Sequence, residues 1–173
     1  MGTFPRALAA ALLAAHGAAL AQEKAHLDKL RFLEAVALTG RSAESDVALF
    51  GALVGEPVEV AEDLQAPLRG ATRSFVALRR AQAPDRIAGH LMLRFGLGPG
   101  ERYVLVADVA LEPRFECLRL HDLAAKLGPA RDTVTRGVEV VAAAFGLASG
   151  ASARFAFAAD GCARWLMLRR NAD

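Results

Sequence analysis

The sequence has few of the residues from which most catalytic and metal sites are built. Its 173 residues include four histidines, two cysteines and five serines. His26, His90 and His121 lie far apart in the chain, and no two histidines have the short spacing typical of metal ligands. No serine lies in a Gly-x-Ser-x-Gly turn, and the glycine-rich stretch 96–100 lacks the Lys-Ser/Thr end of a phosphate loop. We therefore expect no metal, no cofactor and no enzymatic activity.

Two polar clusters remain as weaker candidates for chemistry. His121 precedes Asp122 at the start of an expected helix, where a carboxylate could orient an imidazole, but the helix dipole alone also favours aspartate there. Four acidic residues follow the first expected helix: Glu56, Glu59, Glu62 and Asp63. Acid catalysts need apolar burial, so we expect a solvated surface here, or a patch that docks a basic partner. An envelope hydrolase with an unfamiliar site stays open as an alternative.

The charges nearly balance, and this excludes a class of partners. The chain has 21 basic and 19 acidic side chains, for a net charge of +2. A chain so close to neutral gives no reason to expect nucleic acid or an anionic membrane surface as partner.

The first 21 residues have the pattern of an export signal. Arg6 precedes an uncharged run of Ala and Leu, from Ala7 to Ala21, which ends in Ala-Leu-Ala. This run has 15 residues, fewer than the roughly 20 that span a bilayer. A positive start, a short apolar run and a small-x-small end are typical of a signal peptide, and we expect cleavage after Ala21. The mature protein is then periplasmic or secreted, with no membrane span.

The expected export also bears on the state of the two cysteines. An even number of cysteines in an exported chain predicts a disulfide, here between Cys117 and Cys162. The alternative is a pair of buried free thiols.

The sequence also matches itself after a shift of about 73 residues. Three segments match in the same order: 36–41 with 109–114, an apolar helix pattern followed by Gly at 47–55 with 120–128, and 91–94 with 166–169. Such self-similarity predicts an internal duplication, with repeats at 22–100 and 101–173. The alternative is two unrelated halves with generic amphipathic patterning.

Each half is expected to contain one helix and several strands. Each helix has a single apolar stripe that needs a sheet face to cover it, so we predict an α+β fold, two tandem helix-plus-antiparallel-sheet repeats packed as one compact unit. The expected helices are 46–54, capped by Ser45, and 117–127, each followed by Gly and Pro. The expected extended segments are 31–38, 73–80, 86–95, 103–111, 137–145, 152–158 and 163–169.

The expected order after the signal is a strand, a short helix ending in Gly and Pro, and then a strand meander. The segments 47–57 and 120–129 and the strands after them resemble two groups of proteins. One is the outer-membrane assembly accessory lipoproteins of the BamE/SmpA/OmlA type, and the other is the tandem-repeat β-lactamase inhibitor proteins. This chain lacks the lipid-bearing cysteine of the first group and has fewer cysteines than expected for the second. Both groups act by binding another protein, so the resemblance implies a binding role.

Arginines recur on the expected strands of both halves. Strand alternation would place several of them on the sheet face opposite the helices, among aromatics such as Trp165 and Phe95. Arg and Trp are enriched in binding hot spots, so we predict a binding surface at Arg80, Arg94, Trp165 and Arg169. The alternative is ordinary solvated arginine.

The function expected from these features is that of an exported protein-binding module. It would be an inhibitor or immunity protein, or an accessory of envelope assembly, whose partner is another envelope or secreted protein. The alternative outside this class is a carrier of a small apolar ligand, held in a cleft between helix and sheet.

Overall fold

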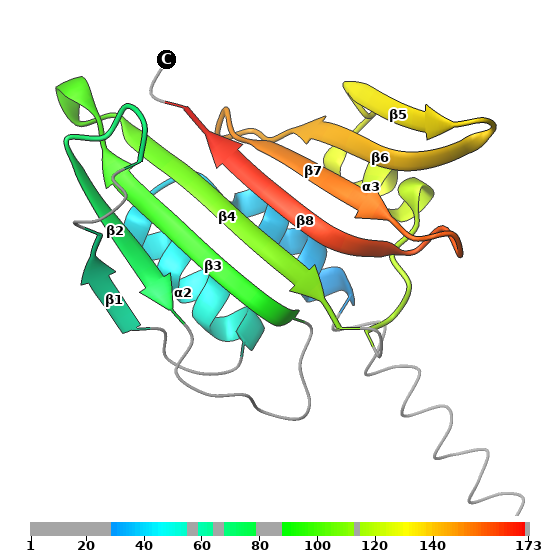
Figure 1. The fold of residues 1–173 in the computed structure, drawn as a ribbon, viewed down its shortest axis with the longest axis horizontal. Helices are drawn as coiled ribbons and strands as arrows, with labels where there is room; N and C mark the ends of the chain where they lie inside the picture. The colour runs from blue at the N-terminus through cyan, green and yellow to red at the C-terminus, as the bar shows by residue number, and fades with distance from the viewer. Residues whose placement is uncertain (1–28, 55–58, 64–67, 79–87, 113–114, 172–173) are drawn as a thin grey trace, which may run out of the picture.

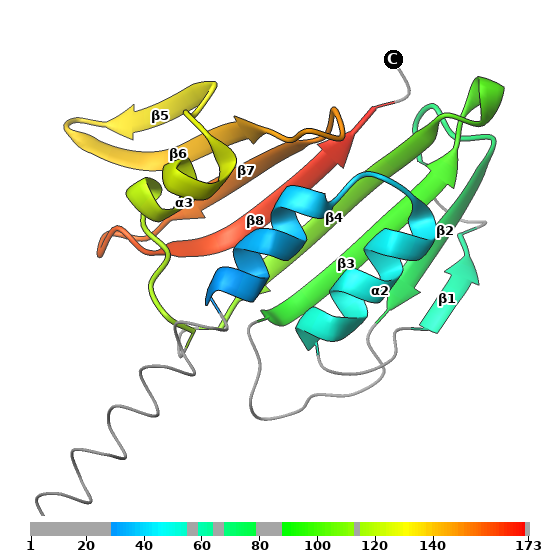
Figure 2. The same ribbon diagram turned by 180° about the vertical axis from the view of Figure 1, so that it is seen from behind.

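The computed structural model describes residues 29–54, 59–63, 68–78, 88–112 and 115–171, which form one sheet with helices on one side. Figure 1 shows the sheet from its uncovered side, and Figure 2 shows the helices packed on the opposite face. A mixed α+β fold is therefore confirmed. The predicted signal sequence at 1–21 and the predicted binding residue Arg80 lie outside the described residues.

The sheet has eight antiparallel strands in the order β1-β2-β3-β4-β8-β7-β6-β5. Two four-strand meanders therefore meet where β4 pairs with β8, and β1 and β5 form the two edges. The strands are β1 (Glu59–Glu62), β2 (Arg73–Leu78), β3 (Ala88–Leu97), β4 (Tyr103–Leu111), β5 (Asp132–Arg136), β6 (Glu139–Gly146), β7 (Ser152–Phe157) and β8 (Ala163–Arg170).

Alternation along the central strands explains why one face is covered. In β4, Leu105, Ala107 and Val109 are fully buried while the residues between them are partly exposed. In β8, Leu166 and Leu168 are buried in the same way. These side chains point toward the helices, because successive strand residues point to opposite faces. The core is therefore the layer between the helices and this face.

Three helices supply the other half of that core. They are the helix at 29–38, α2 (Ala43–Val54) and α3 (Leu120–Leu127). In Figure 2 the helix at 29–38 lies in front of β4 and β8, with α2 on one side of it and α3 on the other. Phe50 of α2 and Leu123 of α3 are both buried in the core.

The helix at 29–38 corrects one prediction, since residues 31–38 were expected to be extended. Phe32, Leu33 and Val36 are buried, whereas Arg31 and Glu34 are exposed. Burial at i, i+1 and i+4 is the spacing of a helix that packs one face. Tertiary packing on the sheet thus favours a helix over the strand that this apolar segment suggested.

Most of the other predicted elements are confirmed, with shifted ends. Strands form at or near the predicted ranges for β2, β3, β4, β6, β7 and β8. The helix predicted at 46–54 starts at Ala43, because the Ser42 hydroxyl, and not that of Ser45, accepts a backbone hydrogen bond, from Ser45 N–H at 3.2 Å. The helix predicted from residue 117 starts at Leu120. Strands β1 and β5 were not predicted.

The three matched segments of the proposed duplication have different outcomes. The match of 47–55 with 120–128 pairs α2 with α3. The match of 36–41 with 109–114 pairs the end of a helix with the end of β4. The match of 91–94 with 166–169 aligns β3 with β8 in sequence. These are the third strand of one meander and the fourth strand of the other. The duplication therefore remains a prediction, and two of the three matches do not join equivalent elements.

The predicted disulfide is present. Cys117 and Cys162 are bonded, with their Cα atoms 4.9 Å apart and a separation of 45 positions in sequence. Cys117 precedes α3 and Cys162 precedes β8, so the bond fixes the start of the helix to the start of a central strand. Among the described residues, no helix has the length and apolar character needed to cross a membrane.

Candidate functional site

The residues predicted to form a binding surface lie on the uncovered face of the sheet. Arg94 lies between buried Leu93 and Phe95 in β3, so it faces away from the helices. Trp165 and Arg169 alternate with buried Leu166 and Leu168 in β8 and also face away. We call the side chains on this surface of β3, β4, β8 and β7 the open face: Met92, Arg94, Val106, Asp108, Ala110, Trp165, Met167, Arg169 and Arg154.

The strand register brings these residues together. Val106 of β4 pairs with Arg94 on one side and with Arg169 on the other, so both arginines flank one valine. Ala110 pairs with Trp165, and Asp108 pairs with both Met92 and Met167. The open face thus combines aromatic, thioether and cationic side chains across three neighbouring strands, two of which are far apart in sequence (Figure 1).

The two arginines that flank Val106 differ in their surroundings. The guanidinium of Arg94 donates to Asp63 Oδ2 from Nε at 3.1 Å, and its second nitrogen lies 2.8 Å from the same oxygen. Its side chain is only 22% exposed. Arg169 is exposed, and Trp165 is 38% exposed. A partner would therefore meet Trp165 and Arg169 more readily than Arg94.

One aromatic residue expected beside them lies elsewhere. Phe95 is buried on the helix side of β3, where it stacks on Phe75 with ring centroids 5.6 Å apart. The expectation that Phe95 lines the open face is wrong. Phe95 lies two positions from Leu93 in β3, so the two side chains point to the same face, opposite that of Arg94.

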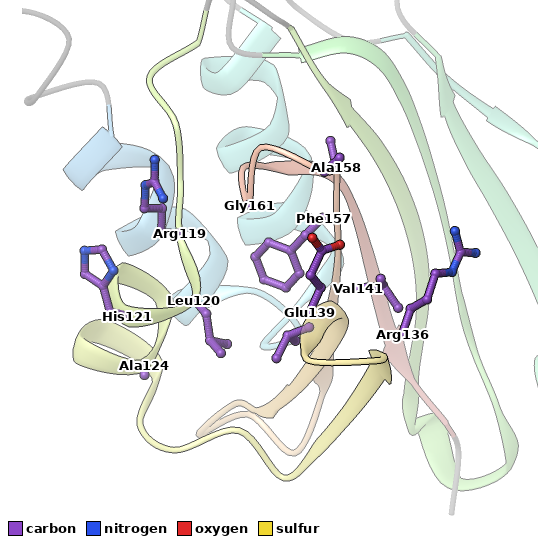
Figure 3. Close-up of a pocket in the computed structure, with 12 residues that line it drawn as sticks. Arg119, Leu120, His121, Ala124, Arg136, Glu139, Val141, Phe157, Ala158 and Gly161 are labelled. Atoms are coloured by element: carbon purple, nitrogen blue, oxygen red, sulfur yellow. The ribbon is translucent and has the colours of Figure 1, made fainter.

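A cavity of about 810 Å³ lies on the helix side of the molecule, between α3, the β5–β6 hairpin and the turn before β8. Leu120, Ala124 and Phe157 form part of its wall and pack against the core. Figure 3 shows the Phe157 ring and the Glu139 carboxylate toward the middle, whereas the Arg136 side chain points away. The cavity is therefore mainly apolar, with Arg119 and His121 also in its lining and one carboxylate directed into it. The apolar ligand carrier considered from the sequence also required a cleft between helix and sheet, but no residue of this cavity was predicted.

His121 and Asp122 form a contact, but the carboxylate has other partners. His121 Nε2 lies 3.3 Å from Asp122 Oδ1, and the imidazole is 76% exposed. Asp122 accepts the backbone N–H of Arg119 at 2.8 Å and pairs with Lys29 at 3.0 Å. Burial opposes ionisation, yet the N–H of Arg119 and the Lys29 ammonium together hold the pKa of Asp122 below its usual value. The carboxylate thus caps α3 and joins it to the first helix.

The acidic segment is also engaged within the protein. Glu62 accepts two hydrogen bonds from Arg73, at 2.9 and 3.1 Å, and this contact lowers the pKa of Glu62. Asp63 pairs with Arg94 across the sheet. Glu56 lies outside the described residues, as does the side chain of Glu59. The two acids that the structure describes are therefore neutralised by arginine.

A buried polar cluster was missed by sequence reasoning. Asp46 of α2 has no exposed surface; it accepts the Gly40 N–H at 3.0 Å and the Tyr103 hydroxyl at 2.8 Å. Burial raises the pKa of Asp46 despite these bonds, and burial together with Asp46 raises the pKa of Tyr103. Arg170 of β8 donates to the Gly40 carbonyl and lies 5.9 Å from the Tyr103 ring. This cluster joins the corner between two helices to β4 and β8, a structural role.

In the part of the chain that the structure describes, no three His, Cys, Asp or Glu side chains come together as a metal site would require. Comparison with protein-family models, with curated proteins and with solved structures finds no match to this chain.

Proposed function

We propose that this protein is exported and binds another envelope or secreted protein through the open face of its sheet, without catalysing a reaction. The observation that carries the proposal is the common placement of Arg94, Trp165 and Arg169 on a face that no described helix covers. Binding would make the protein an inhibitor, an immunity protein or an accessory of envelope assembly, according to the partner.

The composition of the open face supports a protein as the partner. Trp and Arg are the residue types that contribute most often to binding hot spots, and Met adapts its shape to an apolar partner. Met92 and Met167 flank Asp108, and Val106 lies between the arginines. The mixture of charge and apolar surface, on rigid strands, suits a folded protein surface better than a polyanion.

The disulfide is compatible with the proposed location. Bonds of this kind persist in oxidising compartments and are rare in the reducing cytosol. The Cys117–Cys162 bond therefore agrees with the export signal proposed at 1–21, whose removal would leave the mature chain 22–173.

The proposal includes the duplication and the resemblance to tandem-repeat inhibitors and assembly accessories. Two four-strand meanders, joined side by side with helices on one face, have the arrangement that two copies of one helix-and-sheet unit would give. The sequence match that aligns α2 with α3 also supports an origin of the two halves by duplication.

The test is capture of the partner by the exported protein. A tagged protein, produced with residues 1–21 and recovered from the periplasm or medium, should retain a protein that a Trp165→Ala, Arg169→Glu variant loses. Arg31→Glu is the matched control, because Arg31 is an exposed arginine on the helix at 29–38, on the opposite side of the sheet. Equal capture by all three proteins, or none by the wild type across several growth conditions, would contradict the proposal.

The cavity favours a second candidate function, the carriage of a small apolar ligand. Its wall includes Leu120, Val140 and Phe157, and the Glu139 carboxylate would hydrogen-bond a donor group on that ligand (Figure 3). Native mass spectrometry of the purified protein should then detect a bound small molecule. Ala158→Trp, at the edge of the cavity, should expel it, whereas Ala125→Trp on an exposed part of α3 outside the cavity should not. A ligand retained by both variants would contradict this function.

A further inference from the structure

The strand β5 is a sheet edge whose side chains are all exposed. It pairs with β6 on one side, and in the part of the chain that the structure describes it is the last strand of the sheet. All five of its residues are exposed, including Val134 at 40%, and Val138 in the following turn is 99% exposed. An edge of this kind presents a row of backbone N–H and C=O groups to any strand that approaches.

The sequence of β5 is complementary to itself. It reads Asp132-Thr133-Val134-Thr135-Arg136, with opposite charges at its two ends, a threonine inside each end and a valine at the centre. In an antiparallel pair centred on Val134, Asp132 of each strand lies opposite Arg136 of the other. The same pair sets threonine opposite threonine and valine opposite valine. Opposite charges and threonine pairs at directly opposed positions both stabilise antiparallel strands.

The charges also select this arrangement over the alternatives. A parallel pair in register would place Asp132 beside Asp132 and Arg136 beside Arg136, and like charges directly opposite each other are destabilising. A register slip of two residues would leave each charge without its partner. The strand contains no proline or lysine, two residues that commonly protect natural edges. The other edge, β1, has a glutamate at each end, so its self-pairing would oppose like charges.

We propose that β5 is a homodimerisation edge, which pairs antiparallel with β5 of a second copy of this chain. The two sheets would become one, related by a twofold axis perpendicular to the sheet, so that both open faces lie on the same side. The contact is one short strand, far smaller than a standard protein interface, so the dimer should be weak and should form reversibly as the concentration rises. This proposal does not depend on the proposed function or on the identity of any partner.

Charge exchange at the two ends provides the test. Sedimentation velocity over about a hundredfold range of protein concentration should show a monomer–dimer equilibrium for the wild type. Asp132→Arg places arginine opposite arginine twice, and Arg136→Asp places aspartate opposite aspartate twice. Each single variant should weaken self-association by about tenfold, because two attractive pairs become repulsive.

Two combinations of these changes should restore association. In the double variant D132R/R136D, each end again meets the opposite charge. An equimolar mixture of the two single variants should form a heterodimer with about the wild-type affinity, because one strand then has two arginines and the other two aspartates. This mixture also controls for folding, since a misfolded variant could not restore binding.

Other outcomes would overturn the proposal. A wild-type protein that stays monomeric at the highest concentration has no such edge contact. Self-association that Asp132→Arg leaves unchanged, or that the mixture fails to restore, would place the contact on another surface.

Discussion

The hydroxyl of Tyr103 provides the sharpest test of the buried polar cluster. Tyr103 is the only tyrosine of the chain and is 8% exposed at the start of β4. Its hydroxyl donates to Asp46 Oδ2 at 2.8 Å, and Asp46 itself is fully buried. The change Tyr103→Phe removes this donor and keeps the ring, which packs near Phe95 and under the Arg170 guanidinium.

The expected loss follows from the kind of hydrogen bond that is removed. A hydrogen bond to a charged acceptor contributes about 1.5–3 kcal/mol to folding, so Tyr103→Phe should lower the free energy of unfolding by about 2 kcal/mol. The ring still fills its space, so no term for a large cavity is added. With a urea m-value of about 2 kcal/mol/M for a domain of this size, the midpoint should fall by about 1 M.

The loss should also depend on pH. Burial raises the pKa of Asp46 above its usual 3.8, so the folded state binds a proton at a higher pH than the unfolded state. The contribution of this group to stability therefore decreases as the pH rises from 3.8 through the raised pKa, and is constant above it. The Tyr103 hydroxyl stabilises the ionised form, so Tyr103→Phe should cost less near pH 4 than near pH 7.

The assay is urea unfolding monitored by the fluorescence of Trp165, the single tryptophan, with circular dichroism as a second probe. Asp46→Asn provides the control, because Tyr103→Phe should cost much less in a chain where the charged acceptor is already absent. A midpoint shift below about 0.2 M, or equal costs in the two backgrounds, would refute the assignment of this hydrogen bond as a major stabilising contact.

Three further predictions concern the backbone, the disulfide and the cap of α3. Gly40→Ala should destabilise by about 2–4 kcal/mol, because φ is +86° and a Cβ would lie 2.8 Å from that of Ala151; Gly128→Ala, with the same φ and nothing within 4 Å, should cost only about 1 kcal/mol. Equal costs would show that the close approach is unimportant. Replacing both Cys117 and Cys162 by Ala should lower the free energy of unfolding by about 4 kcal/mol, the loop-closure value for a separation of 45 residues. An unchanged urea midpoint would contradict this. The pKa of Asp122 is held low by the Arg119 N–H and by Lys29 against the effect of burial, so its contribution is present above its usual pKa and is lost as the pH falls through the lowered pKa. Asp122→Asn should therefore destabilise at neutral pH and little at about pH 2, measured by thermal unfolding; a cost independent of pH would contradict it.

The sequence predicts the parts of the fold whose pattern is local. The strands β4 and β8 alternate buried and exposed residues, and their predicted limits are close to the observed ones. The end of α3 is marked by Gly128, whose φ of +86° and bond to the Ala124 carbonyl terminate the helix. The disulfide was predicted from the expected export and the even count of cysteines, without geometric information.

The missed elements lack such a local signal. The five residues of β5 are all exposed, so no apolar alternation identifies the strand. The segment at 29–38 contains aromatic and β-branched residues that fit a strand as well as a helix until the sheet that buries Phe32 and Val36 is known. The strand β1 was missed because its two glutamates lie near Gly55, Pro57 and Ala61, which suggested a loop.

The candidate site was also predicted only where its residues follow a local pattern. Alternation was enough to place Arg94, Trp165 and Arg169 on one face. The pairing of β4 with β8, which brings Arg94 and Arg169 to either side of Val106, depends on contacts between residues about 60 positions apart, and these are not visible in any local pattern. The cavity beside α3 depends on how far a helix layer extends over the sheet, a property of the whole assembly.

The order of the strands also constrains how the chain can fold as it emerges from the ribosome. The last strand along the chain, β8, is one of the two central strands of the sheet, and its Arg170 donates a hydrogen bond to the Gly40 carbonyl. A chain that emerges N-terminus first can form the meander β1–β4, but β4 has no neighbour on its second side until residues 163–170 have arrived. Until then Ala107 and Val109 lack their β8 neighbours Leu168 and Leu166. The folded state is therefore reached only when the whole of β8 is available to pair with β4.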